Sequence, residues 1–154
     1  MNAAELSAWG RKAVRARWDR VRRWTLARVA ARTRQNPEEF GSALREFYRE
    51  MGLRPDRMLI SDRPARTGNP QYDAYLAAVS ECVATRRNWP APDWIFDADR
   101  FLSAPYFGNA PAGMRAFLIH QSPLVFRLRN IFVEPQSVEL AIGKAAGKGA
   151  GPWR

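Results

Sequence analysis

The sequence predicts an all-α fold: a small, irregular helical domain that opens with a long basic helix and leaves room for one or two very short strands. Three observations indicate this class. Runs of β-branched residues are few, apolar residues recur at spacings of three and four, and Asn-Pro or Ser-Pro pairs stand where helices should begin. With 154 residues, of which 46% are hydrophobic, the chain has the usual size of one domain and enough apolar side chains for a core.

The first predicted element is one continuous helix over residues 7–33. Residues 5–34 contain no proline, and Gly10 is their only glycine. A narrow stripe, with arginines on both sides, recurs at spacings of 4, 3, 4 and 4 and consists of Val14, Trp18, Val21, Thr25 and Val29.

The second helix should begin at the pair Asn36-Pro37. Asn36 suits an N-cap, Pro37 suits the first helical position, and Glu39 can close a capping box. Apolar residues then recur at spacings of three and four up to Met51, and Gly52 stands where a left-handed cap is wanted.

The third helix should begin at Asn69-Pro70 and end near Arg87, before the turn "NWPAPDW". Residues 53–69 form the connection before it, in which Met58-Leu59-Ile60 either packs into the core or makes a short strand.

Only short elements are predicted after this helix. The segments "DADRFL" and "GMRAFLIH" are typical of brief helices, and Ser122 before Pro123 is expected to cap a helix over "LVFRLR". The segment "NIFV" suggests a brief strand, and Gln136-Ser137 opens a last helix through Ile142. We therefore divide the chain into a basic N-terminal helix (1–35), a helical body (36–142) and a disordered tail (143–154).

No catalytic set emerges from the polar residues. His120 is the only histidine and has no Cys nearby to share a metal, and Cys82 falls on the apolar face of the third helix, so we expect it to be buried. Ser122 lacks the G-x-S-x-G motif of a nucleophile elbow. The sequence therefore predicts neither an enzyme nor a cofactor or metal site.

The acidic residues Asp93, Asp97 and Asp99 form a cluster that allows two interpretations. They could bind a divalent ion, but their spacing also suits helix caps and first-turn acids, with Arg100 as a salt-bridge partner, which we favour.

Compartment and membrane contact are constrained by simple features. One cysteine cannot form an internal disulfide, which fits a reducing cytoplasm. No apolar run is long enough to span a bilayer, and arginines interrupt every side of the first helix, so we expect no membrane partner.

The net charge of +10 is concentrated at the N-terminus. Residues 1–34 carry ten Arg or Lys against two acids, a net of +8, and the remaining residues contribute only +2. Clustered arginines with tryptophan suit phosphate and base contacts as well as protein-interface hot spots, so this segment alone leaves nucleic acid and a partner protein nearly even. The candidate binding residues here are Arg11, Arg15, Arg17, Trp18, Arg22, Arg23, Trp24 and Arg28.

The C-terminal half carries a set of motifs: "YDAYLAAVSECVATRRNWPAPDWI", "RFLSAPYF" and "MRAFLIHQSPLVFRLRNIFV". Over residues 70–142 it resembles a family of small, uncharacterised bacterial proteins that are often encoded beside nucleotidyltransferases in toxin–antitoxin-like pairs. The resemblance implies the non-enzymatic, antitoxin-like member of such a pair.

Within the matched part, Arg127, Arg129 and Asn130 are closely spaced polar residues that follow a predicted helix. They could bind a phosphate or an acidic partner surface, or they could hydrogen-bond to neighbouring turns.

The favoured hypothesis is a non-enzymatic cytoplasmic binding protein, antitoxin-like or a regulatory accessory, that binds a partner protein, with a nucleotidyltransferase as the candidate partner. The alternative is a nucleic-acid-binding helical subunit of a larger ribonucleoprotein or DNA-bound assembly, with RNA or DNA held by the basic helix.

Overall fold

The computed structural model describes residues 3–142, and the all-α prediction is confirmed there. No β-strand occurs within this range, and one isolated parallel bridge pairs Tyr106 with Ile131. The chain divides into two units, Met1–Ala65 and Arg66–Arg154. The predicted disordered tail, residues 143–154, lies outside the described residues.

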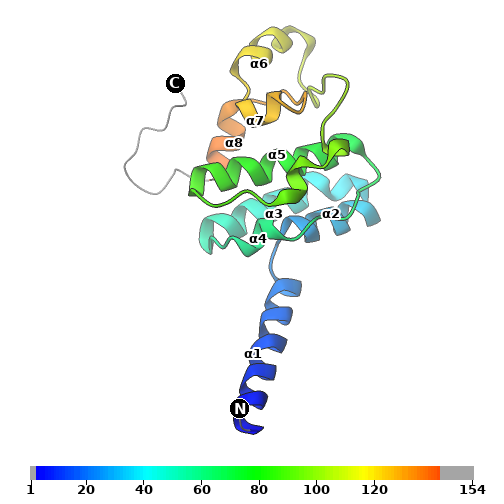
Figure 1. Cartoon of the computed structure of the whole chain (residues 1–154). Coiled ribbons are helices and arrows are strands. Elements are labelled where there is room, and N and C mark those ends of the chain that lie inside the picture. Colours follow the sequence, from blue (N-terminus) through cyan, green and yellow to red (C-terminus); the bar gives the residue numbers. More distant parts are fainter. Residues whose placement is uncertain (1–2, 143–154) are drawn as a thin grey trace. The chain divides into compact units, whose positions relative to one another are not determined.

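The first unit contains four α-helices and one short 3₁₀ helix within its described residues (Figure 1). They are α1 (Ala3–Arg22), α2 (Leu26–Gln35), η1 (Pro37–Glu39), α3 (Phe40–Leu53) and α4 (Met58–Ser61).

The single helix predicted over residues 7–33 is wrong, because the chain breaks between α1 and α2. Thr25 is extended, with φ −79° and ψ 161°, and its hydroxyl accepts a hydrogen bond from the backbone N–H of Arg28 at 3.1 Å. Thr is a good N-cap because its side-chain oxygen satisfies a donor that the first helical turn leaves free. The apolar stripe predicted along one helix is therefore divided: Val14 and Trp18 lie in α1, and Val29 lies in α2.

The core of the first unit lies where α2 packs on α3 and α4. Its side chains are fully or almost fully buried, and the largest are Leu26 and Val29 of α2, Phe47 and Met51 of α3, and Leu59 and Ile60 of α4. Met58-Leu59-Ile60 thus packs as a helical turn, one of the two outcomes that the sequence left open, and not as a strand.

The start of the second predicted helix is confirmed, but two of its details are wrong. Asn36 accepts the N–H of Glu38 at 3.2 Å as an N-cap, yet its own N–H already donates to the carbonyl of Arg32 at 2.9 Å. The capping box with Glu39 has no donor left to satisfy, and Glu39 pairs with Arg32 at 2.8 Å. Gly52 lies inside α3, without the positive φ of a left-handed cap.

The second unit is built around α5 (Pro70–Arg87), whose start and end the sequence predicted correctly. Asn69 accepts the N–H of Gln71 at 2.9 Å, and Asn88 closes the helix in the left-handed conformation with φ 54°. Around it lie η2 (Asp93–Phe96), η3 (Ala98–Arg100), η4 (Ala112–Met114), α6 (Arg115–Gln121), α7 (Leu124–Arg127) and α8 (Pro135–Ile142).

Helix α5 is buried along most of its length, and η2, η3 and α7 pack against it. Small side chains such as Ala74, Ala77 and Ala78 let these short segments approach its backbone closely. Cys82 is buried in this helix, as the apolar pattern predicted.

Ser122 has a different role from the predicted N-cap. Its hydroxyl accepts the N–H of Val133 at 2.8 Å and donates toward the carbonyls of Leu118, at 2.6 Å, and Val133, at 2.9 Å. Pro123 precedes α7 in its place. The buried Ser122 therefore fastens the end of α6 to the segment that follows α7.

The strand expected at "NIFV" is reduced to the single bridge at Ile131. In this bridge the backbone N–H of Tyr106 donates to the carbonyl of Asn130 at 2.8 Å, and its carbonyl accepts from the N–H of Phe132 at 2.9 Å.

None of the helices within residues 3–142 combines the length with the apolar character that crossing a bilayer requires.

Candidate functional site

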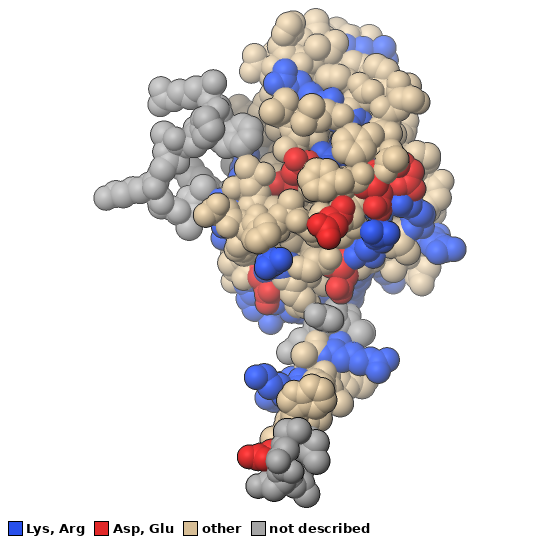
Figure 2. Space-filling model, in the orientation of Figure 1, with Lys and Arg blue, Asp and Glu red and all other residues tan. Residues whose placement is uncertain are grey.

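Helix α1 exposes nearly all of its described side chains. Ala, Arg and Lys are strong helix formers, which accounts for a helix of 20 residues with little apolar packing. Two indoles are among the exposed groups, Trp9 at 71% and Trp18 at 59%. Basic side chains follow the described part of α1 in the space-filling view (Figure 2).

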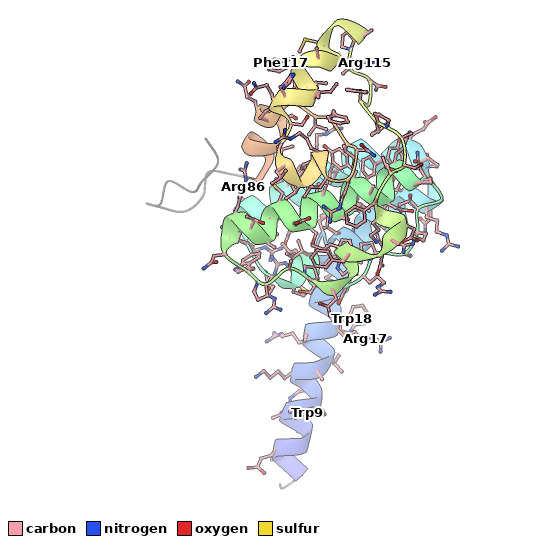
Figure 3. The ribbon with its side chains drawn as sticks, turned by 45° about the horizontal axis from the view of Figure 1, so that its top comes forward. Trp9, Arg17, Trp18, Arg86, Arg115 and Phe117 are labelled. Atoms are coloured by element: carbon pink, nitrogen blue, oxygen red, sulfur yellow. The ribbon has the colours of Figure 1, made fainter. Side chains whose placement is uncertain are left out.

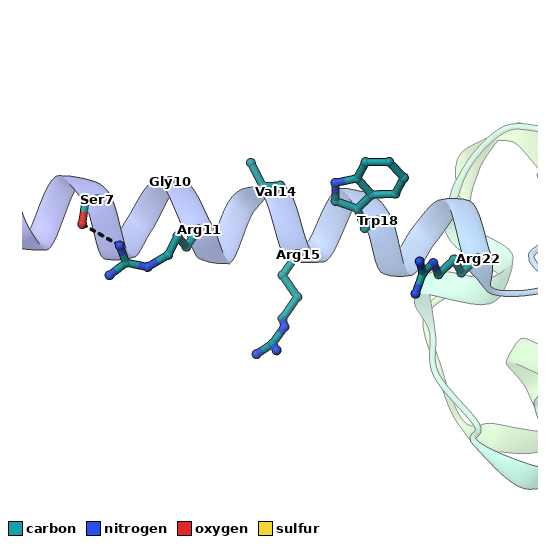
Figure 4. A pocket seen from close by; sticks show the side chains of 7 residues that line it. All are labelled: Ser7, Gly10, Arg11, Val14, Arg15, Trp18 and Arg22. Carbon is teal, nitrogen blue, oxygen red and sulfur yellow. Dashed lines mark hydrogen bonds between the residues drawn. The ribbon is translucent and has the colours of Figure 1, made fainter.

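Three arginines form a row on one side of α1. Arg11, Arg15 and Arg22 are separated by four and seven residues, so at 3.6 residues per turn they fall within about 40° of one another around the helix axis. Figure 4 shows them with Val14 and Trp18 beside the row. Together with Ser7 and Gly10 these side chains line a shallow, open hollow, which we call the α1 face.

The arginines of the α1 face form no ion pair with the acidic side chains that the structure describes. Arg11 donates to the neutral hydroxyl of Ser7 at 2.9 Å. An unneutralised row of guanidinium groups attracts anions, and each planar fork can hold a phosphate or a carboxylate in a bidentate manner.

Arg23, one residue beyond the row, binds other residues of the first unit. Its Nε lies 2.6 Å from Oε1 of Glu50, its Nη1 lies 3.1 Å from Oδ2 of Asp56, and its Nη2 donates to the carbonyl of Arg54. Its side chain is 13% exposed. Arg23 was predicted to contact a partner, and the structure shows that its donors are satisfied inside the first unit.

Arg28 and Trp24 are also used locally. The Cζ atom of Arg28 lies 4.1 Å from the centre of the Trp24 ring, and its Nη1 donates to the carbonyl of Arg22 at 2.5 Å. Arg22 is the last residue of α1, where a free carbonyl and the negative end of the helix dipole favour a cation. Arg28 therefore caps the C-terminal end of α1, and the Trp24 ring packs against its guanidinium group; both residues are half-buried.

The remaining exposed residues of α1 lie away from the row. Arg17 is about 160° around the axis from Arg15, and Trp9 is about 180° from Trp18. Figure 3 labels Trp9, Arg17 and Trp18 along the helix. Of the N-terminal residues that the sequence selected, the structure brings together Arg11, Arg15, Trp18 and Arg22.

The second cluster of candidates, in the second unit, is mostly structural. Arg129 is 1% exposed, and it donates to Glu81 at 2.5 Å and to the carbonyls of Val125 and Ile95 at 3.0 Å each. Its Cζ atom also lies 4.7 Å from the centre of the Phe101 ring.

Asn130 has φ 59° and donates to the carbonyl of Leu102 at 2.7 Å, whereas Arg127 is exposed. Hydrogen bonding to neighbouring turns, the second interpretation of this cluster, thus describes Arg129 and Asn130, and surface binding is open only to Arg127.

The acidic cluster forms ion pairs. Arg66 Nη2 lies 2.6 Å from Asp99 Oδ1 and 3.4 Å from Asp97 Oδ2, and the completely buried Arg100 stacks on Trp94 at 4.7 Å. Burial, and next the repulsion of Arg66, lower the pKa of Arg100. The nearby Asp side chains act in the opposite direction, but the pKa remains below its usual value. Within residues 3–142, no group of three or more His, Cys, Asp or Glu side chains is placed to hold a metal ion.

Four exposed apolar side chains on the second unit were not apparent from the sequence. Phe117 and Ile119 of α6, together with Leu124 and Leu128 in and after α7, are all exposed. Phe117 and Ile119 flank the buried Leu118, and the buried Val125 and Phe126 lie between Leu124 and Leu128, so these short helices give no periodic pattern that separates exposed from core residues.

Comparison of the chain with family models, curated proteins and solved structures finds no match.

Proposed function

We propose that the protein binds nucleic acid without catalysing a reaction, and that the α1 face is its contact surface. The observation that carries this proposal is the row of Arg11, Arg15 and Arg22, which are exposed, lie on one side of the helix and form no ion pair with any described acid. Arginines in such a row neutralise phosphates and release the counterions that surround a polynucleotide.

From the sequence, a partner protein was favoured over nucleic acid. The exposure of α1 supports the opposite order. A stable protein interface buries about 800 Å² on each partner around an apolar, aromatic centre. The described apolar side chains on the α1 face are only Val14 and Trp18, with arginines beside them. Such a narrow strip supports phosphate contact better than a protein interface.

The test is a fluorescence-anisotropy titration of labelled RNA and DNA with the full chain and two variants. Arg11, Arg15 and Arg22 are replaced by Gln in the first variant. The second replaces Arg45, Arg49 and Arg57, three exposed arginines of the first unit, and so has the same net charge. Binding that is lost in the first and largely kept in the second supports the α1 face, and equal affinities contradict it.

A specific observation favours a second candidate, a partner protein bound by the second unit. Phe117, Ile119, Leu124 and Leu128 are exposed apolar side chains of neighbouring segments, and of these Leu124 and Leu128 are four residues apart. The resemblance over residues 70–142 makes this an antitoxin-like or regulatory role, with a nucleotidyltransferase as the partner.

Co-expression with a nucleotidyltransferase tests the second candidate. Leu128→Asp should abolish copurification, whereas the triple variant of the α1 face should retain it. Copurification that survives Leu128→Asp and Leu124→Asp would count against this surface.

A further inference from the structure

We propose that the α1 face binds single-stranded rather than duplex nucleic acid, with Trp18 as a stacking surface for an unpaired base and the arginine row as its phosphate contacts. This inference rests on the proposed function and specifies its ligand.

The first argument is the position of Trp18 within the row. Along the axis, at 1.5 Å per residue, Trp18 lies about 4.5 Å beyond Arg15 and about 6 Å before Arg22. Around the axis it is about 20° from Arg11, about 40° from Arg22 and about 60° from Arg15. A base stacked on this indole would therefore lie between Arg15 and Arg22 along the axis, and their long side chains could reach toward the phosphates that flank it.

The second argument is the exposure of the indole. A side chain as large as Trp that remains 59% exposed leaves much of its ring surface in water. Stacking on a base removes that apolar surface from water, and every base offers a ring face, so the contact does not require a particular sequence.

The third argument is the state of the bases. In a duplex the ring faces are covered by the neighbouring base pairs, and an indole beside the phosphates finds nothing to stack on. Only an unpaired strand lets Trp18 and the arginines act together.

Trp9 provides the matched control. It is even more exposed than Trp18, but its position is about 180° from Trp18 around the axis of α1, away from the row. Indoles on opposite sides also cannot both enter one membrane surface, so an anionic bilayer would use at most one of them.

The experiment compares the full chain with the variants Trp18→Leu, Trp9→Leu and Trp18→Phe. The probes are labelled oligothymidylate, polyuridylate, an oligoadenylate–oligothymidylate duplex and phosphatidylglycerol vesicles. Far-UV circular dichroism verifies that the helix content is unchanged, which is expected because both indoles are exposed.

The expected result is preferential binding of the single strands, with a loss of roughly tenfold in Trp18→Leu, a smaller loss in Trp18→Phe and no change in Trp9→Leu. Single strands should also quench tryptophan fluorescence in the wild type and in Trp9→Leu but much less in Trp18→Leu.

Equal affinity for the duplex, or unchanged affinity in Trp18→Leu, overturns this inference and leaves the proposed function standing. Absence of binding to every polynucleotide, with or without binding to the vesicles, overturns both.

Discussion

Arg23 Nε lies 2.6 Å from Glu50 Oε1, and both side chains are only 13% exposed. This ion pair joins the segment between α1 and α2 to the end of α3. Arg23 thus holds the fold together, whereas Arg11, Arg15 and Arg22 of α1 form no ion pair with a described acidic side chain.

The first prediction concerns the stability that Arg23 supplies. Arg23→Gln removes the charge from three hydrogen-bonded contacts and leaves the partly buried Glu50 with fewer partners. We expect the free energy of unfolding to fall by about 1–3 kcal/mol, measured by urea titration. Arg17→Gln, at an exposed position of α1, should stay within about 0.5 kcal/mol of the wild type. Equal stabilities of the two variants would refute the role of Arg23.

The second prediction concerns the salt dependence of binding. If Arg15 neutralises one phosphate of a single strand, Arg15→Gln should reduce the slope of log affinity against log salt concentration by about 0.7. Dissociation constants measured over a series of salt concentrations give this slope. Arg127→Gln, which removes the same charge from α7, should leave the slope unchanged. An unchanged slope in Arg15→Gln would mean that Arg15 touches no phosphate.

The third prediction separates the two arginines of "RLR". Arg129→Met leaves Glu81 and two backbone carbonyls without their donor, and we expect a loss of about 3 kcal/mol in unfolding free energy. Arg127→Met, at an exposed position, should lie within about 0.5 kcal/mol of the wild type. Thermal or urea unfolding of both variants checks the difference. If Arg129→Met is stable, the buried network around it has no energetic role.

The fourth prediction concerns alkaline pH. Burial, and next the neighbouring Tyr72, raise the pKa of Tyr106 above its usual value of 10.0. The folded state therefore holds this proton more tightly, so its contribution is fully present below the unfolded pKa and disappears as the pH rises through the folded pKa. Melting temperatures measured across this range should fall less steeply with pH in Tyr106→Phe. The same slope in both proteins would contradict the assignment.

Local signals were sufficient to predict α5. Asn69 and Pro70 mark its start, and Asn88 before the proline-rich turn marks its end, so each boundary depends on residues within one turn of the helix. The burial of Cys82 followed from the same local pattern, because a helix that is buried on most sides places any small apolar residue in the core.

The roles of the arginines could not be predicted because their partners are distant in sequence. Arg23 pairs with Glu50 and Asp56, 27 and 33 residues away, and Arg129 pairs with Glu81, 48 residues away. The sequence alone therefore does not distinguish an arginine that forms a buried ion pair from one that is exposed to solvent. The break at Thr25 was not predicted because the residues around it are mostly good helix formers. One threonine within such a run does not indicate that a new helix begins there.

The exposure of α1 also links its ligand affinity to a helix–coil equilibrium. Most helical stability in proteins comes from tertiary packing, and the described side chains of α1 contribute little of it. The fraction of molecules whose arginine row is already assembled then limits the affinity. Gly10 lowers that fraction, and a methyl group added there meets no atom within 4 Å. Gly10→Ala should therefore raise the helix content in circular dichroism and tighten binding by up to about fivefold, whereas warming should weaken it before the rest of the chain unfolds.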